Sequence, residues 1–410
     1  MRPGALAELA GVVGSDRVRE GLPEDAPAGG SPPLVARPGS PEEVGEVLAW
    51  ASSQGLAVVV RGGGTKPSWG APARSCELIL ETLGLDRLLE HEPGDLTCVA
   101  EAGMRLDQLQ DRVSSVAGHR QRLMLDPAQG GGATLGGLVA TGASGPLRAR
   151  YGTARELLLG ARFALADGTV ARTGGKVVKN VAGYDLDKLL VGSLGTLAVV
   201  LEVSLRLHPM PEGSRMVALE GISPEVAASF CSRVRRAPVA PTLLEALWPE
   251  RTVLVRFDGS MAGALSQAGV VASLEPGARV LGEDEAGHFE ERLRGRPWEG
   301  AGSVAGFGLP VSRTASLLEL AEEGGLVRQL SLRAGLGVGE ARLDEHPESL
   351  VRFRERVGAL GGFVSAHRHQ GPGAVGLDPL DPVAAELALA VKVALDPSGT
   401  LAPGRGPGGA

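Results

Sequence analysis

The chain has 410 residues, enough for two domains at roughly 150 residues per domain. Its net charge of −7 gives no electrostatic reason to expect a nucleic acid or an anionic membrane as partner. Its three cysteines do not supply the four thiolates that usually hold an iron–sulfur cluster, which excludes such a cluster within this chain alone. Neither a signal peptide nor an apolar run of about 18 residues is evident, so we expect a cytoplasmic protein that reaches a membrane only through partners.

The first part of the chain predicts alternating helices and strands. Residues 1–29 read as a short helix followed by a loose stretch of Gly, Pro and Ala. Ser40 is a good N-cap for the next helix, Pro41 takes its first position, and Glu43 completes a capping box. The apolar run 56–60 then predicts a buried strand that leads directly into a glycine loop.

That loop, Arg61-Gly-Gly-Gly-Thr65, is the first motif with chemical potential. Successive glycines after a buried strand can point their N–H groups at an anion, and Arg61 or Lys66 could add positive charge. A flexible turn with solvated cations is the alternative. The loop is not a Walker motif, because GxxxxGK[ST] is absent, and it is not GxGxxG opening a helix, because Pro67 and Trp69 follow.

A second glycine-rich stretch runs from Thr134 to Pro209. Four glycines interrupt residues 134–145, which predicts that this segment is not a good helix. Its small residues would allow a planar ring system to lie against the backbone, although a surface loop is the alternative. A hairpin over 156–172 and a tight turn at 192–197 follow. We infer that the backbone wraps around a flat, polar dinucleotide.

The remainder of the chain carries fewer chemical signals. Strands and helices alternate, which predicts an antiparallel sheet with helices on one face. His367 and His369 would share one face of a strand, but no third ligand is in view, so we predict no metal site. The tail runs through a helix and a turn to Arg405.

Several motifs together resemble the FAD-linked oxidases whose flavin domain is of the vanillyl-alcohol-oxidase type, also called PCMH-type. The motifs are residues 58–70, 134–148, 150–153, 174–186 and 192–197. Residues 174–186, with the Gly-Arg pair near the end of the chain, look most like the FAD-binding subunits of bacterial glycolate oxidases.

The resemblance implies an α+β fold in which two subdomains clasp FAD and an α+β, ferredoxin-like cap follows. The corresponding division is an N-terminal helix and loose segment at 1–29, a PCMH-type FAD-binding domain at 30–212 and a C-terminal cap domain at 213–410. Relatives that bind flavin covalently use a His or Cys in these loops. None stands there in this chain, so the expected FAD is noncovalent. Gly142 replaces a common Asn, which weakens one polar contact.

The resemblance also implies individual cofactor contacts. Backbone amides of Gly62 to Thr65 would bind the pyrophosphate, and Arg405 would return toward the flavin. Lys179, Asn180 and Tyr184 would face the isoalloxazine side. The implied cofactor-binding residues are Arg61, Gly62, Gly63, Gly64, Thr65, Thr134, Gly136, Gly137, Thr141, Ser144, Gly145, Tyr151, Gly152, Lys179, Asn180, Gly195, Thr196, Leu197 and Val199.

The implied function is that of an FAD-binding oxidoreductase subunit of a glycolate-oxidase-type complex, which oxidises a 2-hydroxy acid to a 2-oxo acid. Its implied partners are a catalytic flavoprotein subunit and an iron–sulfur subunit. Catalytic relatives share a Gly-Glu-His-Gly motif in the cap, which Ala366-His-Arg-His369 does not match, so no catalytic residue is assigned. Two alternatives stay open. One is a stand-alone dehydrogenase of glycolate or D-lactate, with Lys179, Tyr184 or a cap histidine in catalysis. The other is a non-catalytic assembly subunit.

Overall fold

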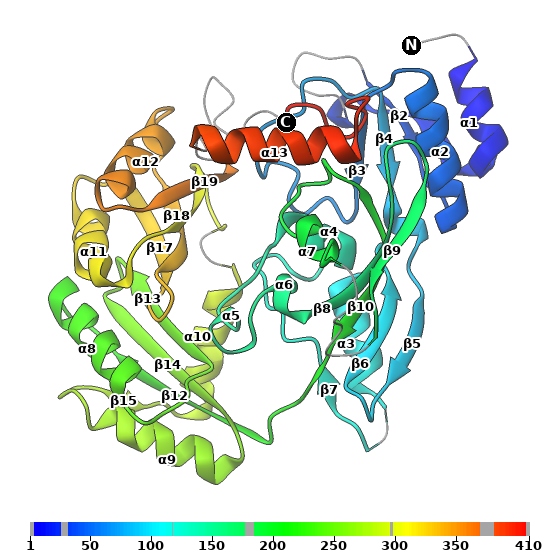
Figure 1. Ribbon diagram of the computed structural model, residues 1–410. Coiled ribbons are helices and arrows are strands. Elements are labelled where there is room, and N and C mark those ends of the chain that lie inside the picture. The colour runs from blue at the N-terminus through cyan, green and yellow to red at the C-terminus, as the bar shows by residue number, and fades with distance from the viewer. Residues whose placement is uncertain are drawn as a thin grey trace.

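The computed structural model describes residues 4–25, 32–116, 118–176, 184–295, 298–369 and 381–406. Figure 1 shows two parts side by side. We call residues 4–209 together with 381–406 the first lobe, and residues 213–369 the cap lobe. No helix in the described ranges is both long and apolar enough to span a membrane.

The first lobe begins with a sheet of four strands in the order β1-β2-β4-β3. In that order the strands span Val18–Glu20, Leu34–Ala36, Leu78–Glu81 and Val58–Arg61. β4 pairs in parallel with both β2 and β3, so these three strands end at the same edge of the sheet. The glycine loop follows β3 at that edge.

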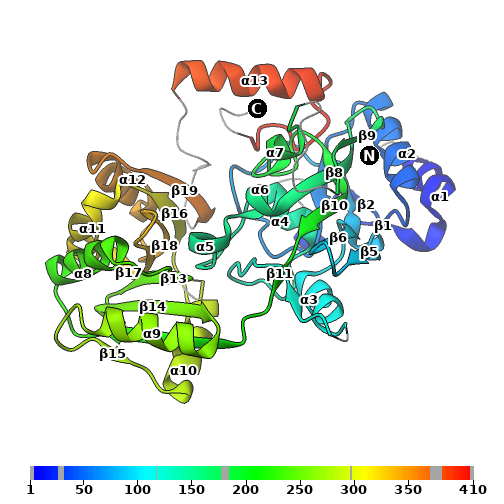
Figure 2. The same ribbon diagram turned by 60° about the horizontal axis from the view of Figure 1, so that its bottom comes forward.

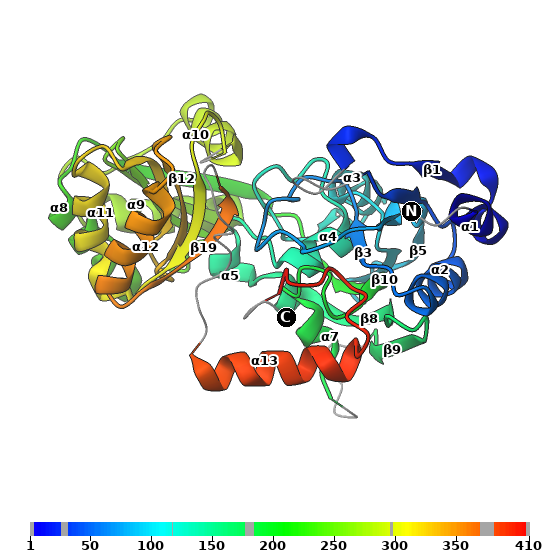
Figure 3. The same cartoon turned by 90° about the horizontal axis from the view of Figure 1, so that it is seen from above.

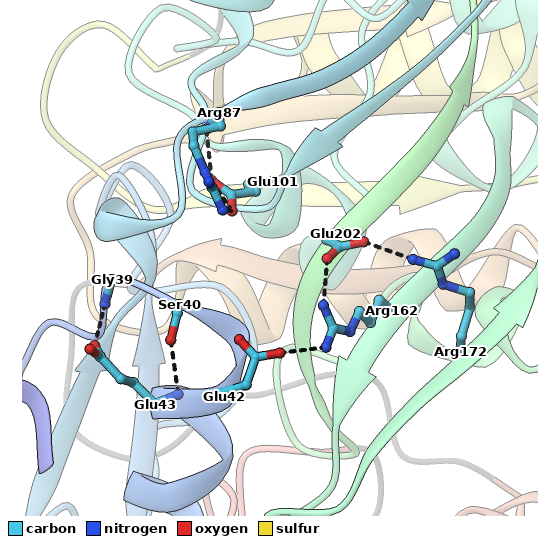
Figure 4. A network of polar contacts seen from close by, with 9 residues as sticks. All are labelled: Gly39, Ser40, Glu42, Glu43, Arg87, Glu101, Arg162, Arg172 and Glu202. Carbon is cyan, nitrogen blue, oxygen red and sulfur yellow. Dashed lines mark hydrogen bonds and ion pairs between the residues drawn. The ribbon is translucent and has the colours of Figure 1, made fainter.

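Helix α2, Pro41–Ser53, begins as the sequence predicts. Ser40 Oγ accepts a hydrogen bond from the Glu43 backbone N–H at 3.1 Å, which satisfies one of the unpaired donors of the first turn. Val44 and Leu48 of α2 are fully buried in one core cluster with helix α1, Ala5–Val13, and the first sheet. The amphipathic helix and its N-cap are therefore confirmed. The capping box is not, because the Glu43 carboxylate accepts from the Gly39 N–H at 2.8 Å instead of the Ser40 N–H (Figure 4).

The second sheet of the first lobe has five antiparallel strands in the order β5-β6-β10-β8-β9. They span Leu88–Glu92, Thr97–Glu101, Val199–Arg206, Leu158–Ala164 and Val170–Gly174. On one face Glu202 of β10 accepts hydrogen bonds from Arg162 at 2.8 Å and Arg172 at 3.1 Å (Figure 4). Arg162 also donates to Glu42 of α2 at 2.8 Å, so this network ties the second sheet to the helix that packs on the first.

Short elements connect these strands. The helices are α3 (Leu106–Ser114), α4 (Leu135–Thr141), α5 (Arg148–Tyr151), α6 (Ala154–Leu157) and α7 (Asp187–Leu190). Two further strands, β7 at Gln121–Arg122 and β11 at His208–Pro209, pair antiparallel.

Helix α4 corrects one expectation, because residues 135–141 are helical despite their glycines. Thr134 Oγ1 caps the helix by accepting from the Gly137 N–H at 3.3 Å. A Cβ at Gly136 would lie 2.8 Å from Ala102 Cβ, so glycine lets the helix backbone approach the chain that follows β6. Tertiary packing thus outweighs the low helix propensity of these residues.

The cap lobe is one antiparallel sheet of eight strands built from two βαββαβ units. The first unit comprises β12 (Gly213–Leu219), α8 (Pro224–Arg236), β13 (Leu243–Trp248), β14 (Thr252–Gly259), α9 (Met261–Ala272) and β15 (Arg279–Val280). The second comprises β16 (Val304–Gly308), α11 (Thr314–Glu322), β17 (Val327–Arg333), β18 (Val338–Leu343), α12 (Ser349–Ala359) and β19 (Phe363–Arg368). Each unit has the ferredoxin-like strand order, and β13 pairs with β17 to join them.

Helices α8, α9, α11 and α12 all contribute to one core cluster, and they lie on the side of the sheet away from the first lobe (Figure 3). The predicted antiparallel sheet with helices on one face is confirmed for these four. Helix α10, Glu283–Gly295, instead packs in a separate core cluster through Phe289. The strands of the second unit therefore turn their other face toward the first lobe.

The C-terminal segment leaves the cap lobe and returns to the first lobe. Helix α13, Pro382–Leu395, lies beside α7 (Figures 1 and 2). Beyond it, Leu401 forms a parallel bridge with Val58 of β3 and is fully buried in the core of the first sheet. Residues assigned to the cap domain by sequence thus complete the first lobe.

Candidate functional site

A cavity lies in the first lobe where β3, α4 and the start of β10 meet. Its empty volume is about 910 Å³, open mouth included, which falls within the range of cofactor sites. The residues that line it are Val59, Val60, Arg61, Gly62, Gly63, Gly64, Thr65, Lys66, Pro67, Thr82, Ala133, Thr134, Gly136, Gly137, Leu138, Ala140, Thr141, Leu194, Gly195, Ala198, Val200 and Arg405.

Two backbone segments touch at the wall of this cavity. A Cβ at Gly63 would lie 1.8 Å from the Gly132 carbonyl oxygen, and one at Gly62 would lie 2.1 Å from Thr134 Oγ1. No side chain fits at either position, so glycine is required by packing. The contact holds the loop after β3 against the start of α4, and together they form a narrow backbone cradle.

Arg61 has a structural partner set of its own. Its guanidinium donates to Asp25 at 2.5 Å and to Glu81 at 2.8 Å, so two carboxylates already neutralise it. The backbone of Arg61 lines the cavity, but its side-chain charge is engaged elsewhere. The positive charge of the cavity must come from other residues.

Lys66 and Arg405 supply that charge. Lys66 is buried, at 8% exposed, and the hydrogen bond of its Nζ is to Thr65 Oγ1 at 3.3 Å. Burial lowers the pKa of Lys66 to about 8, and the Glu340 carboxylate acts in the opposite direction. Arg405 Nη2 donates to the carbonyls of Pro67 at 2.8 Å and Trp69 at 3.1 Å, and burial lowers the pKa of Arg405. Neither cation has a carboxylate within 4 Å among the described residues.

One further donor here is unsatisfied. Arg405 Nε is buried without a hydrogen-bond partner in the described part of the chain. A buried unpaired donor costs about 1–3 kcal/mol, so such groups mark a place where a ligand supplies acceptors. With the glycine cradle and the two cations, this donor set fits a dinucleotide with a pyrophosphate dianion. The backbone amides of Gly62 to Thr65, Lys66 and Arg405 would hold FAD.

The structure gathers about half of the predicted cofactor residues at the cavity. Those that line it are Arg61, Gly62, Gly63, Gly64, Thr65, Thr134, Gly136, Gly137, Thr141 and Gly195. Lys66 and Arg405 also line it; the sequence suggested Lys66 as a charge at the anion loop and Arg405 as a residue that returns toward the flavin. Leu194 lines it as well and was not predicted.

The other predicted residues lie elsewhere. Thr196 is buried and donates to the Ser193 carbonyl at 2.7 Å, and Val199 belongs to the core of the first sheet. Leu197 is half-buried. Gly145 packs on Asp126, and Ser144 Oγ accepts a hydrogen bond from Arg148 at 3.1 Å.

Tyr151 contacts the His208 ring edge-to-face at 4.9 Å, and Gly152 ends α5 at φ 83°. Lys179 and Asn180 fall outside the described residues. The roles predicted for these positions stay predictions.

Sequence reasoning did not find a charged cluster on the cap sheet. Glu245 of β13 lies directly opposite Arg333 of β17, and Glu340 of β18 opposite Ser331. Arg333 lies 3.6 Å from both Glu245 and Glu340, and Ser331 Oγ donates to Glu245 at 2.8 Å. All four side chains are buried. The cluster arises because cross-strand neighbours share one face of an antiparallel sheet.

His367 of β19 extends this cap cluster. Its Nδ1 lies 3.5 Å from Glu340 Oε1. A Cβ at Gly306 would lie 2.5 Å from the His367 ring, so glycine makes room for the imidazole. Burial alone would raise the pKa of Glu340, but its interaction with the nearby His367 and the charge of Arg333 outweigh burial and hold that pKa below its usual range.

The loop that lines the cavity also contacts the cap cluster. Trp69 stacks on the His367 ring with centroids 3.7 Å apart, and Ser68 Oγ donates to the His367 carbonyl at 2.6 Å. Lys66 interacts electrostatically with Glu340. Cofactor cavity and cap cluster therefore meet at residues 66–70.

Comparisons with known proteins agree with this geometry. Residues 32–174 match the FAD binding domain family. The chain is 31% identical to D-lactate dehydrogenase of Archaeoglobus fulgidus, over 95% of this chain and 94% of that protein. It is 32% identical to glycolate oxidase subunit GlcE of Escherichia coli, over 61% of this chain and 67% of that subunit. Several other relatives are matched over about half of their own length.

The fold is shared more widely. p-Cresol methylhydroxylase, at 15% identity, superposes with a TM-score of 0.75 over 98% of this chain and 96% of that one. The α+β architecture is thereby confirmed. FAD as the cofactor is confirmed by the match to the FAD binding domain family. From its near full-length similarity to a curated relative, the chain belongs to the FAD-linked oxidases with a PCMH-type FAD-binding domain and is an FAD-dependent oxidoreductase.

Proposed function

We propose that this protein oxidises a 2-hydroxy acid to the corresponding 2-oxo acid. The observation that carries the proposal is its similarity to D-lactate dehydrogenase along nearly the whole of both chains. The contact between the cofactor cavity and the cap cluster at residues 66–70 also supports the proposal. Bound FAD supplies the hydride acceptor and passes the electrons on.

The reaction also requires a group that accepts the hydroxyl proton. Of the three kinds of candidate that the sequence offers, Tyr184 is 88% exposed and Lys179 lies outside the described residues. His367 is packed between Trp69 and Glu340 at the boundary of the lobes. We assign proton acceptance to His367, with the Glu340 carboxylate orienting the ring and Arg333 keeping that carboxylate ionised.

We further propose that the protein works as a subunit of a glycolate-oxidase-type complex. Its similarity to GlcE over two thirds of that subunit supports this assignment. The partners would be a catalytic flavoprotein subunit and an iron–sulfur subunit, through which the protein would reach a membrane. The chain's own three cysteines are unpaired, and Cys98 and Cys231 are buried, so electrons would leave through a partner.

The second candidate is a stand-alone FAD-dependent dehydrogenase of D-lactate or glycolate. The match to D-lactate dehydrogenase favours it, because it covers 94% of that protein, against 67% of GlcE. In this case the flavin of the isolated chain should be reduced by substrate without partners.

An anaerobic absorption experiment tests both candidates. The purified chain should show oxidised-flavin bands, and acid precipitation should release the FAD because we predict noncovalent binding. Bleaching by D-lactate or glycolate would establish the stand-alone enzyme. Bleaching only after addition of the partner subunits would establish the complex. Flavin that stays oxidised in both conditions would refute 2-hydroxy-acid oxidation and favour an assembly role.

A further inference from the structure

Arg148 lies on helix α5, which contacts strand β13 of the cap, and no carboxylate neutralises it. It is the first residue of α5 and is half-buried. Its Nη1 donates to Ser144 Oγ at 3.1 Å, which uses one of the five guanidinium N–H groups. Among the described residues, no carboxylate oxygen lies within 4 Å of it.

Its neighbours across the boundary are different. Arg333 lies between Glu245 and Glu340, each at 3.6 Å. Arg256 of β14 pairs with Asp258 at 2.7 Å and with Glu290 at 3.4 Å. These two cap arginines are each paired with carboxylates, whereas Arg148 is not.

The electrostatic surroundings of Arg148 make this imbalance unfavourable in the ligand-free protein. Burial lowers the pKa of Arg148, and so does the positive charge of Arg333. The carboxylates of Glu156, Glu340 and Glu245 act in the opposite direction without forming an ion pair with it. A half-buried guanidinium with unused donors is stabilised when an anion binds to it.

The position of Arg148 indicates which anion. One turn before it, Ser144 follows α4, whose residues 136–138, 140 and 141 line the cofactor cavity. Helix α5 itself contacts strand β13 of the cap, which carries Glu245 of the charged cluster. Arg148 therefore belongs to the part of the first lobe that joins the wall of the cofactor cavity to the cap sheet.

We propose that Arg148 binds the carboxylate of the substrate. This inference rests on the proposed oxidation of a 2-hydroxy acid and names the residue that selects an acid over a simple alcohol. The planar guanidinium can hold both carboxylate oxygens in a fork of two hydrogen bonds. That contact would present the hydroxyl-bearing carbon between the cofactor cavity and the His367–Glu340 pair.

Calorimetric titration of the holoprotein with oxalate, an unreactive dicarboxylate, tests the assignment. Arg148→Met should raise the Kd for oxalate about 10- to 100-fold, and Arg148→Lys should give a smaller loss. FAD content and the flavin spectrum should be unchanged. Arg150→Met is the matched control: Arg150 is exposed, two residues further along the same helix, and its loss should leave the Kd unchanged.

The outcomes separate this inference from the proposed function. Equal oxalate affinity in Arg148→Met and wild type would overturn the inference, as would a wild type that binds neither oxalate nor D-lactate nor glycolate. Loss of FAD from Arg148→Met would instead place the residue at the cofactor and also overturn it. If oxalate binds through Arg148 but no 2-hydroxy acid bleaches the flavin, the carboxylate site stands and the proposed oxidation falls. If Arg148→Met does not fold, an unchanged oxalate affinity in Arg148→Lys would overturn the inference.

Discussion

Trp69 and His367 stack face to face across the boundary of the two lobes, with ring centroids 3.7 Å apart and planes 8° from parallel. Trp69 follows the glycine cradle by five residues, and His367 belongs to the last strand of the cap. Gly70 N–H, donating to the Ala366 carbonyl at 3.2 Å, reinforces the contact. The loop that lines the cofactor cavity is therefore also in contact with the cap.

Removing the Trp69 ring should destabilise the contact between this loop and the cap. Trp69→Leu leaves a cavity beside His367, and we expect the free energy of unfolding to fall by about 2–4 kcal/mol. Trp69→Phe keeps an aromatic ring on the imidazole, so its free energy of unfolding should fall by about half as much. Urea titration of the holoprotein measures both. Equal stability of the two variants would show that stacking does not join the lobes.

Neighbouring glycines of the cradle should respond very differently to alanine. In Gly63→Ala the new methyl would overlap the Gly132 carbonyl, so we expect a loss of about 3 kcal/mol in stability and no retained FAD. Gly64 has φ +65° but open space around its Cβ position, so Gly64→Ala should cost about 1 kcal/mol and keep FAD. Flavin absorbance per protein after gel filtration compares them. Yellow Gly63→Ala protein would argue against the cradle.

FAD affinity should depend on pH through Lys66. The pKa of Lys66 is lowered to about 8 in the free protein, and a bound pyrophosphate dianion would raise it by stabilising the ammonium. The complex then holds a proton that the free protein has lost, so affinity should fall as pH rises above 8, by up to about tenfold per pH unit. Titrations of apoprotein with FAD between pH 7 and 10 measure this fall.

Two variants at this position serve as controls for that titration. Lys66→Arg stays charged throughout the range and should bind FAD with little pH dependence. Lys66→Met should bind weakly at every pH. A wild-type affinity that does not change between pH 7 and 10 would exclude Lys66 from the phosphate contact.

His367 should matter for turnover more than for cofactor binding. Replacing a general base lowers the rate about 10²- to 10⁴-fold, so His367→Asn should lower kcat by at least about 100-fold while most FAD is retained. His288, exposed on α10, provides the control, and His288→Asn should be fully active. Turnover is measured with D-lactate or glycolate and a dye acceptor, with partner subunits present if they are required. A near-normal kcat in His367→Asn would show that another group accepts the hydroxyl proton.

The buried pair Lys392–Asp396 should be a stability determinant of the first lobe. Lys392 Nζ donates to Asp396 at 2.5 Å and to the carbonyls of Thr196 at 2.7 Å and Leu401 at 2.8 Å. Asp396→Ala leaves the ammonium buried without its counter-charge, which costs about 3–5 kcal/mol. Glu386→Ala, on the exposed side of the same helix α13, should change the unfolding midpoint little. Chemical denaturation of both variants provides the comparison.

Local signals account for what could be predicted from sequence. The N-cap at Ser40, the strand before the glycine loop and the alternation of strands and helices in the cap depend on neighbouring residues, and the structure has all three. About half of the predicted cofactor residues line the cavity, because each glycine motif is a continuous segment of the sequence. Helix α4 was missed because its glycines are explained only by close approach to Ala102.

The charged groups were harder to place, because their partners are distant in sequence. Arg61 is neutralised by Asp25 and Glu81, which lie 36 and 20 residues away. The cap cluster combines Glu245 with Arg333, which become neighbours only through the pairing of β13 with β17. No spacing rule connects such residues, since strand order and register decide which of them meet.

The bridge between Leu401 and Val58 sets an order of events during biosynthesis. Residues 58–65 are made early, yet β3 gains its Leu401 neighbour and the cavity gains Arg405 only after translation has passed residue 405. FAD can therefore be captured in its final form only after the chain has been made that far. A message truncated within α13 would yield a first lobe that lacks both this strand contact and one of its two cofactor-facing cations.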